Sequence, residues 1–401
     1  AVRCQRAWLE LLMLPFCTLC PPPRGGHQHR AKGAAFTYTL LRRWKAGDRA
    51  SLWVDVVARA ASRRPSNEPD DVARARRCLT LLREGRCADA ARALVSQGTV
   101  TRTPETEQVL RDKHPRANAS RLAPFRSRLA PPPVVLSDDD VRRAVRSFKT
   151  GSAGASDGLR PSHLRHAVWP AKLLSDTSAP LTALTKLCNL LASGQAPRTL
   201  APYIAGGRLA GLPQEDKIRP IGVATAYNRV AGKATCAVLR PRFRETLVPS
   251  GQLGVAEPMG SEAMVHLSRD WVQRNSQDPW ALAVKIDGRN AFNVCERVTM
   301  LQEIYSNLPE LFAFTAWCYG QPAHLFFQGA VIDSEQGGIQ GDPKMPPAFA
   351  LNFQPLLRQA REAASVVPGE LLELLLSFLD DAFGVVALQG PLHVASGVDA
   401  L

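Results

Sequence analysis

The stretch LLELLLSFLDDAFGVVAL, residues 371–388, places two adjacent aspartates, Asp380 and Asp381, between two apolar segments. Two like charges flanked by apolar residues are costly unless a cation neutralises them. A membrane span is a poor explanation, because acidic residues near its centre strongly disfavour insertion. The pattern predicts a strand, a turn that carries both acids, and a second strand. On this spacing alone, the two open readings are a turn with solvated acids and a site for a divalent metal ion.

A second acid-bearing segment lies upstream, where residues 281–287 (ALAVKID) predict a buried strand that ends in Asp287. If this strand and the segment around Asp380 share one sheet, the two carboxylates can face each other. Carboxylates with open positions for phosphate oxygens are ligands that suit Mg²⁺. Two such ions, about 3.5–4 Å apart, activate an attacking hydroxyl and stabilise a leaving pyrophosphate.

Several further motifs occur in a fixed order over residues 137–390. They are residues 212–213 (LP) with 217–221 (KIRPI), 251–254 (GQLG) with 260–270, 285–293 (KIDGRNAFN), 337–343 (GGIQGDP) and 377–381 (SFLDD). Together they resemble the reverse transcriptases of non-LTR retrotransposons and, more distantly, group II intron enzymes. Each motif alone is weak, whereas the ordered set is specific.

The resemblance assigns a role to each acid and to one aromatic residue. It implies that Asp287 and Asp380 bind two Mg²⁺ ions, with Mn²⁺ as an alternative ion, and that Asp381 assists them. Phe292 falls at the family's steric-gate position, where a ring would clash with a ribose 2′-hydroxyl. Phe292 therefore favours deoxynucleotides as substrates, with a plain core residue as the alternative reading. RNA-directed RNA polymerases usually carry a polar residue there.

The resemblance also implies a nucleotide pocket. Gln340 and Gly341 would line it beside the template and the incoming base, since glycine permits close approach of the backbone. Arg219, assisted by Lys217, would hold the triphosphate, because guanidinium groups bind phosphate oxygens in pairs. The expected partners are an RNA template, a DNA primer and dNTPs, with no membrane. Lys344 departs from the family, which usually has an apolar residue after Gly-Asp-Pro.

The 401 residues are enough for two or three domains and a substantial core. Residues 1–130 hold 25 of the 50 basic residues but 11 of the 36 acidic ones, which accounts for the whole net charge of +14. This excess is able to attract polyanions. Nine cysteines without regular spacing do not indicate a secreted disulfide framework. The expected location is therefore intracellular, in the nucleus or cytoplasm.

The expected fold class is α+β, namely the fingers and palm of a right-hand polymerase, with an antiparallel palm sheet flanked by helices and with the thumb missing. The expected domains are a disordered or undefined terminus (1–35), a basic helical region with a linker at 116–135 (36–130), fingers (131–280) and a truncated palm (281–401). Apolar spacing predicts helices at 72–82, 88–94, 181–191 and 229–240. Ser137 predicts a helix start, and residues 208–223 predict a hairpin.

These observations leave three functions open. The preferred one is an RNA-directed DNA polymerase of a retroelement, which transfers dNTPs to a primer 3′-hydroxyl. The second is a truncated and catalytically inactive remnant that at most binds nucleic acid. The third, an RNA-directed RNA polymerase, is disfavoured by Phe292.

Overall fold

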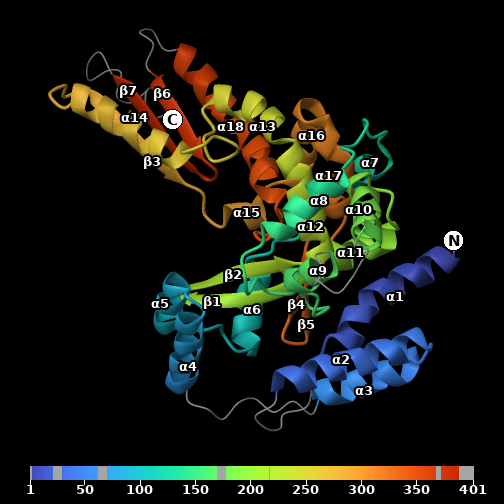
Figure 1. The fold of residues 1–401 in the computed structure, drawn as a ribbon. Helices are drawn as coiled ribbons and strands as arrows, with labels where there is room; N and C mark the ends of the chain where they lie inside the picture. The colour runs from blue at the N-terminus through green and yellow to red at the C-terminus, as the bar shows by residue number, and fades with distance from the viewer. Residues whose placement is uncertain are drawn as a thin grey trace. The chain divides into compact units, whose positions relative to one another are not determined.

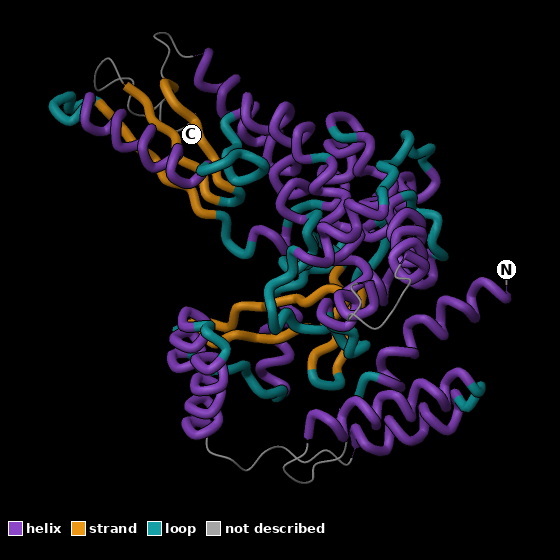
Figure 2. The backbone as a smooth tube through the Cα atoms, in the orientation of Figure 1, coloured by secondary structure: helices purple, strands orange, loops and turns teal. Residues whose placement is uncertain are grey.

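The computed structural model describes residues 2–20, 29–61, 70–168, 178–215, 217–366 and 372–387. Two compact units divide the chain. The first consists of Ala1–Thr106, Ser156–Leu159 and Ala210–Pro220, and the second of Glu107–Ala155, Arg160–Leu209 and Ile221–Leu401. The described strands form two sheets among many helices, so the expected α+β class is confirmed (Figures 1 and 2). Within the described residues, no helix is long and apolar enough to cross a membrane.

The first unit contains small helical groups with separate apolar clusters. Its helices are α1 (Val2–Thr18), α2 (His29–Lys45), α3 (Arg49–Ala61), α4 (Asp70–Arg83) and α5 (Cys87–Val95). The first three helices pack around Cys17, Leu40 and Leu52. The last two pack around a cluster that includes Leu81 and Ala90. The three- and four-residue spacing that predicted α4 and α5 is thus explained by this shared buried face.

Two segments that were expected to be irregular are helical. The prediction of a disordered or undefined terminus over residues 1–35 differs from the structure at residues 2–18, which form α1 and bury Cys17. Within the predicted linker, residues 119–127 form α7 (Ala119–Ser127). Leu122 and Phe125 lie three residues apart and are both buried, and the Phe125 ring lies 6.5 Å from that of Phe312. Burial of these side chains outweighs the helix-breaking tendency of the proline between them.

The second unit has a helical core. Its remaining helices are α8 (Asp138–Arg146), α9 (Pro161–Val168), α10 (Ser178–Ala192), η1 (Arg198–Leu200), α11 (Ala201–Ile204), α12 (Ala226–Val238), α13 (Arg240–Leu247), η2 (Val248–Ser250), α14 (Gly260–Arg274), α15 (Ala291–Val294), α16 (Arg297–Asn307), α17 (Pro309–Tyr319) and α18 (Met345–Val366); α6 (Pro104–Asp112) begins in the first unit. Every residue of α17 from Leu311 to Tyr319 is buried, so this helix is at the centre of the core. Ser137 caps α8 through a reciprocal pair of bonds with Asp140, as predicted.

The first sheet has the strand order β2-β1-β4-β5. Its strands are β1 (Gly207–Gln214), β2 (Lys217–Ala224), β4 (Ala323–Phe327) and β5 (Ala330–Ser334). β1 and β2 form the predicted hairpin, whose tip belongs to the first unit and whose base belongs to the second. β1 runs parallel to β4, with Gly207 opposite Leu325. This sheet was not predicted beyond the hairpin.

The second sheet is antiparallel and has the order β3-β7-β6. Its strands are β3 (Ala281–Asp287), β6 (Leu372–Phe378) and β7 (Asp381–Ala387). Leu375, Leu376 and Val385 form its buried part. The helix α14 lies along this sheet in Figure 1. The predicted strand at residues 281–287 is confirmed, but its predicted burial is wrong, because β3 is an edge strand and is exposed from Lys285 onward.

Candidate active site

The three acids predicted to act together lie at one end of the β3-β7-β6 sheet. Asp287 and Asp381 are directly opposite each other in the β3–β7 ladder. Asp380 occupies the turn between β6 and β7, where its carbonyl oxygen accepts a hydrogen bond of 3.1 Å from the Gly288 amide. The segments 281–287 and 372–387 thus share one sheet, as predicted. We call the end of this sheet that carries Asp287, Asp380 and Asp381 the acidic end of the sheet.

Like charges directly opposite each other on neighbouring strands destabilise a sheet. Asp287 is exposed, whereas Asp380 and Asp381 are half-buried. The sheet therefore keeps Asp287 and Asp381 opposite each other although this pairing is unfavourable for stability. Such locally unfavourable features are common at functional sites.

The donor set at the acidic end suits a hard divalent cation. Mg²⁺ is usually bound by one or two carboxylates together with substrate phosphates, rather than by a complete cage of protein ligands. Asp287 and Asp381 supply two such carboxylates, and Asp380 adjoins them. Among the described residues, however, no group of three or more His, Cys, Asp or Glu side chains is arranged to hold a metal ion. The predicted role of these acids as metal ligands therefore stays a prediction.

Phe292, the predicted gate residue, lies five residues after Asp287 in the short helix α15. Its half-buried ring stacks on the ring of Phe349 in α18, with centroids 4.7 Å apart and planes 22° apart. Its carbonyl oxygen accepts a hydrogen bond of 2.8 Å from the Gly338 amide. Segments 285–293 and 337–343, which are distant in the sequence, therefore meet at Phe292.

The glycines of segment 337–343 are required by close backbone approaches. A Cβ atom added at Gly337, where φ is +55°, would lie 2.2 Å from the carbonyl oxygen of Phe292. A Cβ atom added at Gly341 would lie 2.5 Å from the carbonyl oxygen of Gly222 in β2. Gln340 is half-buried beside Gly341. The predicted pocket residues thus lie in a loop that is pressed between α15 and the base of the hairpin.

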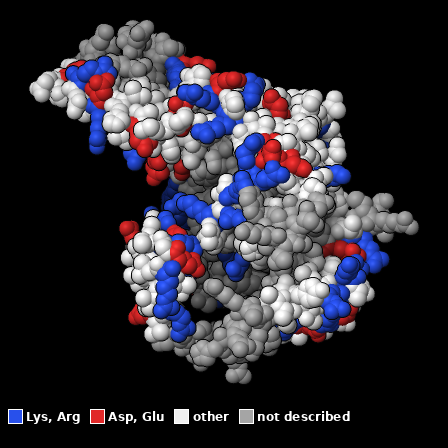
Figure 3. Space-filling model, in the orientation of Figure 1, with Lys and Arg blue, Asp and Glu red and all other residues white. Residues whose placement is uncertain are grey.

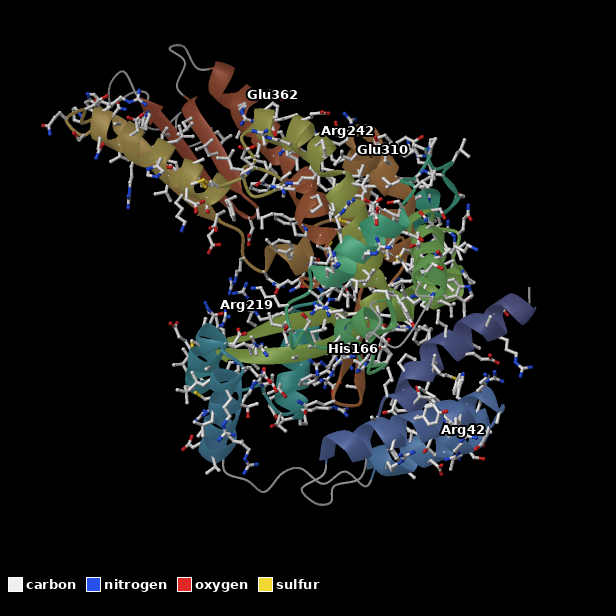
Figure 4. All side chains as sticks on the ribbon, viewed as in Figure 1. Arg42, His166, Arg219, Arg242, Glu310 and Glu362 are labelled. Carbon is white, nitrogen blue, oxygen red and sulfur yellow. The ribbon has the colours of Figure 1, made fainter. Side chains whose placement is uncertain are left out.

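Lys217 and Arg219, the predicted triphosphate ligands, are two residues apart in β2 and are both exposed. Their side chains leave the same face of the strand, since side chains alternate along a strand. Figure 4 labels Arg219 on this hairpin. Both residues belong to the first unit, whereas the acids belong to the second. Their roles therefore rest on the family resemblance.

Lys344, which departs from the family pattern, forms a buried ion pair that the sequence did not reveal. Its Nζ lies 2.9 Å from both carboxylate oxygens of Asp342 and donates to Asn228 Oδ1 at 2.7 Å. The Tyr319 hydroxyl donates to Asp342 at 2.7 Å, and the Lys344 ammonium lies 3.8 Å from the Phe314 ring centroid. Burial alone would lower the pKa of Lys344, but the charge of Asp342 raises it.

Arg297 is a second buried cation that sequence reasoning missed. Its guanidinium donates to the carbonyl oxygens of Gly337, Gln321 and Ser334, each at 2.8 Å. Burial lowers the pKa of Arg297 to about 10, so it remains charged at neutral pH. Because one of its acceptors is Gly337, this side chain helps to fix the loop that carries Gln340 and Gly341.

A raised carboxyl pKa in the first unit gives a pH prediction. Burial raises the pKa of Asp157 from its usual 3.8 to about 6, and one of its oxygens is buried without a hydrogen-bond partner among the described residues. The folded state therefore holds a proton that the unfolded state releases. The contribution of Asp157 to stability should therefore fall as pH rises from about 4 to about 6 and then level off. Calorimetry between about pH 4 and about pH 6 should show that the stability of Asp157→Asn lacks the loss caused by ionisation of Asp157. An identical dependence of stability on pH in Asp157→Asn and the unaltered chain would contradict the raised pKa of Asp157.

The excess of positive charge in residues 1–130 is partly offset by ion pairs between neighbouring residues. Arg43 contacts Asp48 and Asp55, at 2.7 and 2.9 Å, and Arg86 contacts Asp89 at 2.8 Å. On the face drawn in Figure 3, basic and acidic side chains are interleaved. The acids of this region are too few to balance its arginines, so a surplus of positive charge remains available for anionic partners.

The described residues thus define a mixed α+β protein with an acidic end on a three-stranded antiparallel sheet. No family model matches the chain, and no curated protein matches it significantly. One similar solved structure is apo telomerase from Candida tropicalis truncated from its C-terminal domain, with 13% sequence identity and a TM-score of 0.36. The match covers 54% of this chain and 51% of the telomerase chain, about half of each. At this sequence identity and TM-score, the similarity does not establish a shared fold or a shared activity.

Proposed function

We propose that this chain is the RNA-directed DNA polymerase domain of a non-LTR retrotransposon, with the fingers and palm of a right-hand polymerase. The observation that supports this most is the pairing of Asp287 with Asp381 in adjacent strands, with Asp380 in the turn beside them. Two of the ordered motifs that resemble the family also meet in space, because segment 285–293 is hydrogen-bonded to segment 337–343. The proposed substrates are an RNA template, a DNA primer and dNTPs.

In this proposal, Asp287 and Asp380 hold two Mg²⁺ ions, and Asp381 supports them. When bound, Mg²⁺ would supply charge neutralisation for the triphosphate and would lower the pKa of the primer 3′-hydroxyl. The chain itself contributes positioning. Arg219 and Lys217 bind the triphosphate, and Gln340 and Gly341 border the base pair that forms.

Phe292 has a defined task in the same proposal, which is to exclude ribonucleotides by contact with the 2′-hydroxyl. Its stacking on Phe349 fixes the plane of the ring, so the ring cannot easily turn away. We expect Phe292→Val to raise incorporation of ribonucleotides relative to deoxynucleotides by roughly 10–100-fold. Phe292→Tyr keeps the ring and should leave this ratio unchanged. Competitive single-nucleotide addition measures the ratio, and an equal ratio in Phe292→Val and the unaltered chain would remove the gate assignment.

A second candidate function is an inactive reverse-transcriptase remnant that binds nucleic acid. It is favoured by the basic N-terminal region, whose surplus of positive charge can attract an RNA backbone without any catalysis. Binding to RNA and primer extension on that RNA, measured on the same sample, separate the two functions. A remnant binds RNA with a steep salt dependence, because phosphate contacts release counterions, but adds no nucleotide. A polymerase does both.

A further inference from the structure

The turn that carries Asp380 contains a residue in an unfavourable backbone conformation. Leu379, directly before Asp380, has a φ of +59°, in the left-handed region. A residue with a Cβ atom pays roughly 1–2 kcal/mol to occupy this region, so it persists only when its surroundings hold it there. The turn therefore requires a contact that compensates for Leu379.

The side chain of Gln252 makes this contact. Its Oε1 accepts hydrogen bonds from the Leu379 amide at 2.9 Å and from the Gly254 amide at 3.0 Å. Its Nε2 donates to the Leu379 carbonyl oxygen at 3.4 Å. Gln252 is fully buried, so water does not compete for these bonds. One amide side chain thus holds both main-chain groups of Leu379.

The segment around Gln252 is itself fastened to β6. Ser377 donates its amide to Gly251 at 2.8 Å, and its carbonyl oxygen accepts from the Leu253 amide at 2.8 Å. A Cβ atom added at Gly254 would lie 2.7 Å from the Leu379 nitrogen, so only glycine permits this approach. Gln252 is therefore anchored to the same sheet that it supports.

We propose that Gln252 is a positioning residue for Asp380: it holds Leu379 in the left-handed conformation and so fixes where the Asp380 carboxylate points. The role in catalysis rests on the function proposed above, whereas the role in holding the turn does not. Gln252 has no contact with the reacting atoms. Glutamate is a poor replacement, because it lacks the donor and would place a further negative charge near the three aspartates of the acidic end.

The conformational part is tested without activity, by hydrogen exchange of the full-length chain over residues 376–383. In Gln252→Ala the Leu379 amide loses its acceptor, so exchange there should speed up by roughly tenfold or more. Gln354→Ala is the matched control, since Gln354 is also buried but its Nε2 has no hydrogen-bond partner among the described residues. Exchange over residues 376–383 should be unchanged in that control. Unchanged exchange in Gln252→Ala would overturn the proposal whether or not the chain is a polymerase.

The catalytic part is tested by steady-state nucleotide addition. We expect Gln252→Ala to lower kcat by roughly 10–100-fold, with KM for the dNTP within about twofold of the unaltered chain. Adding Leu379→Gly to this variant should restore much of the rate, because glycine adopts positive φ without strain. Absence of rescue, or full activity of Gln252→Ala, would overturn the positioning role. Absence of activity in the unaltered chain would instead overturn the proposed function and leave the exchange result to decide the role of Gln252.

Discussion

Replacing Asp380 with asparagine is expected to lower the rate of dNTP addition by roughly 10³-fold or more, since it removes a charge that acts on the transferring phosphoryl group. Asparagine has nearly the same shape, so the turn between β6 and β7 should keep its hydrogen bond from Gly288 to the residue 380 carbonyl. Single-nucleotide addition to a DNA primer on an RNA template measures the rate.

Loss of folding would not explain this loss of activity. Asparagine keeps the size of the Asp380 side chain and its ability to accept hydrogen bonds, so the melting temperature should stay close to that of the unaltered chain. Glu245→Gln is the matched control, because Glu245 is exposed on α13, outside the motifs that resemble the family, and pairs with Arg242 at 2.9 Å. This control should retain full activity. Equal rates in Asp380→Asn and the control would refute the metal-ligand role.

The second large effect is on stability. Lys344→Met leaves the Asp342 carboxylate buried without its cation, and loss of one partner of a buried pair typically costs about 3–5 kcal/mol. Both side chains are fully buried, so solvent cannot replace the lost partner. We expect the melting temperature to fall by roughly 10 °C or more, measured by calorimetry.

The double variant Asp342→Asn with Lys344→Met separates an uncompensated charge from simple loss of packing. It removes both charges, while Asn228 and Tyr319 can still bond to the new amide. We expect it to recover most of the stability that Lys344→Met loses, so the coupling energy should be far above the roughly 0.5 kcal/mol within which independent sites add. A double variant as unstable as the sum of the two single variants would show that the pair does not act as a unit.

The parts of the site that were predicted from the sequence rest on local patterns. Two apolar runs interrupted by Asp380 and Asp381 predict a strand, a turn and a strand, and this order is confirmed. The turn carries Asp380 but not Asp381, which is the first residue of β7. The Ser137 cap and the β1–β2 hairpin are confirmed for the same reason, because neighbouring residues determine them. The prediction that Asp287 faces Asp380 needed one further assumption, that the strands share a sheet. The strands do share a sheet, but the residue opposite Asp287 in the ladder is Asp381, and Asp380 lies in the turn.

The parts that were missed depend on contacts between distant residues. The strands β4 and β5 join β1 through a parallel pair, which no local pattern specifies. Their turn at Gln328 and Gly329 has φ of 44° and 93°, but Gln-Gly is not among the dipeptides that mark such hairpin turns in a sequence. Lys344 looked like a departure from an apolar position, and only the structure shows that Asp342 compensates its charge. Gln252 lies in the motif at 251–254, but its contact with Leu379 was not predictable, because the two residues are 127 positions apart.

Mg²⁺-dependent addition of a single dNTP to a DNA primer on an RNA template, by the unaltered chain, tests the central claim most directly. The account predicts extension of the primer that requires the divalent ion, favours deoxynucleotides over ribonucleotides and disappears in Asp287→Asn as well as in Asp380→Asn. Extension that survives both substitutions, or no extension by a chain that binds the RNA, would contradict the claim that the acidic end of the β3-β7-β6 sheet is a polymerase active site.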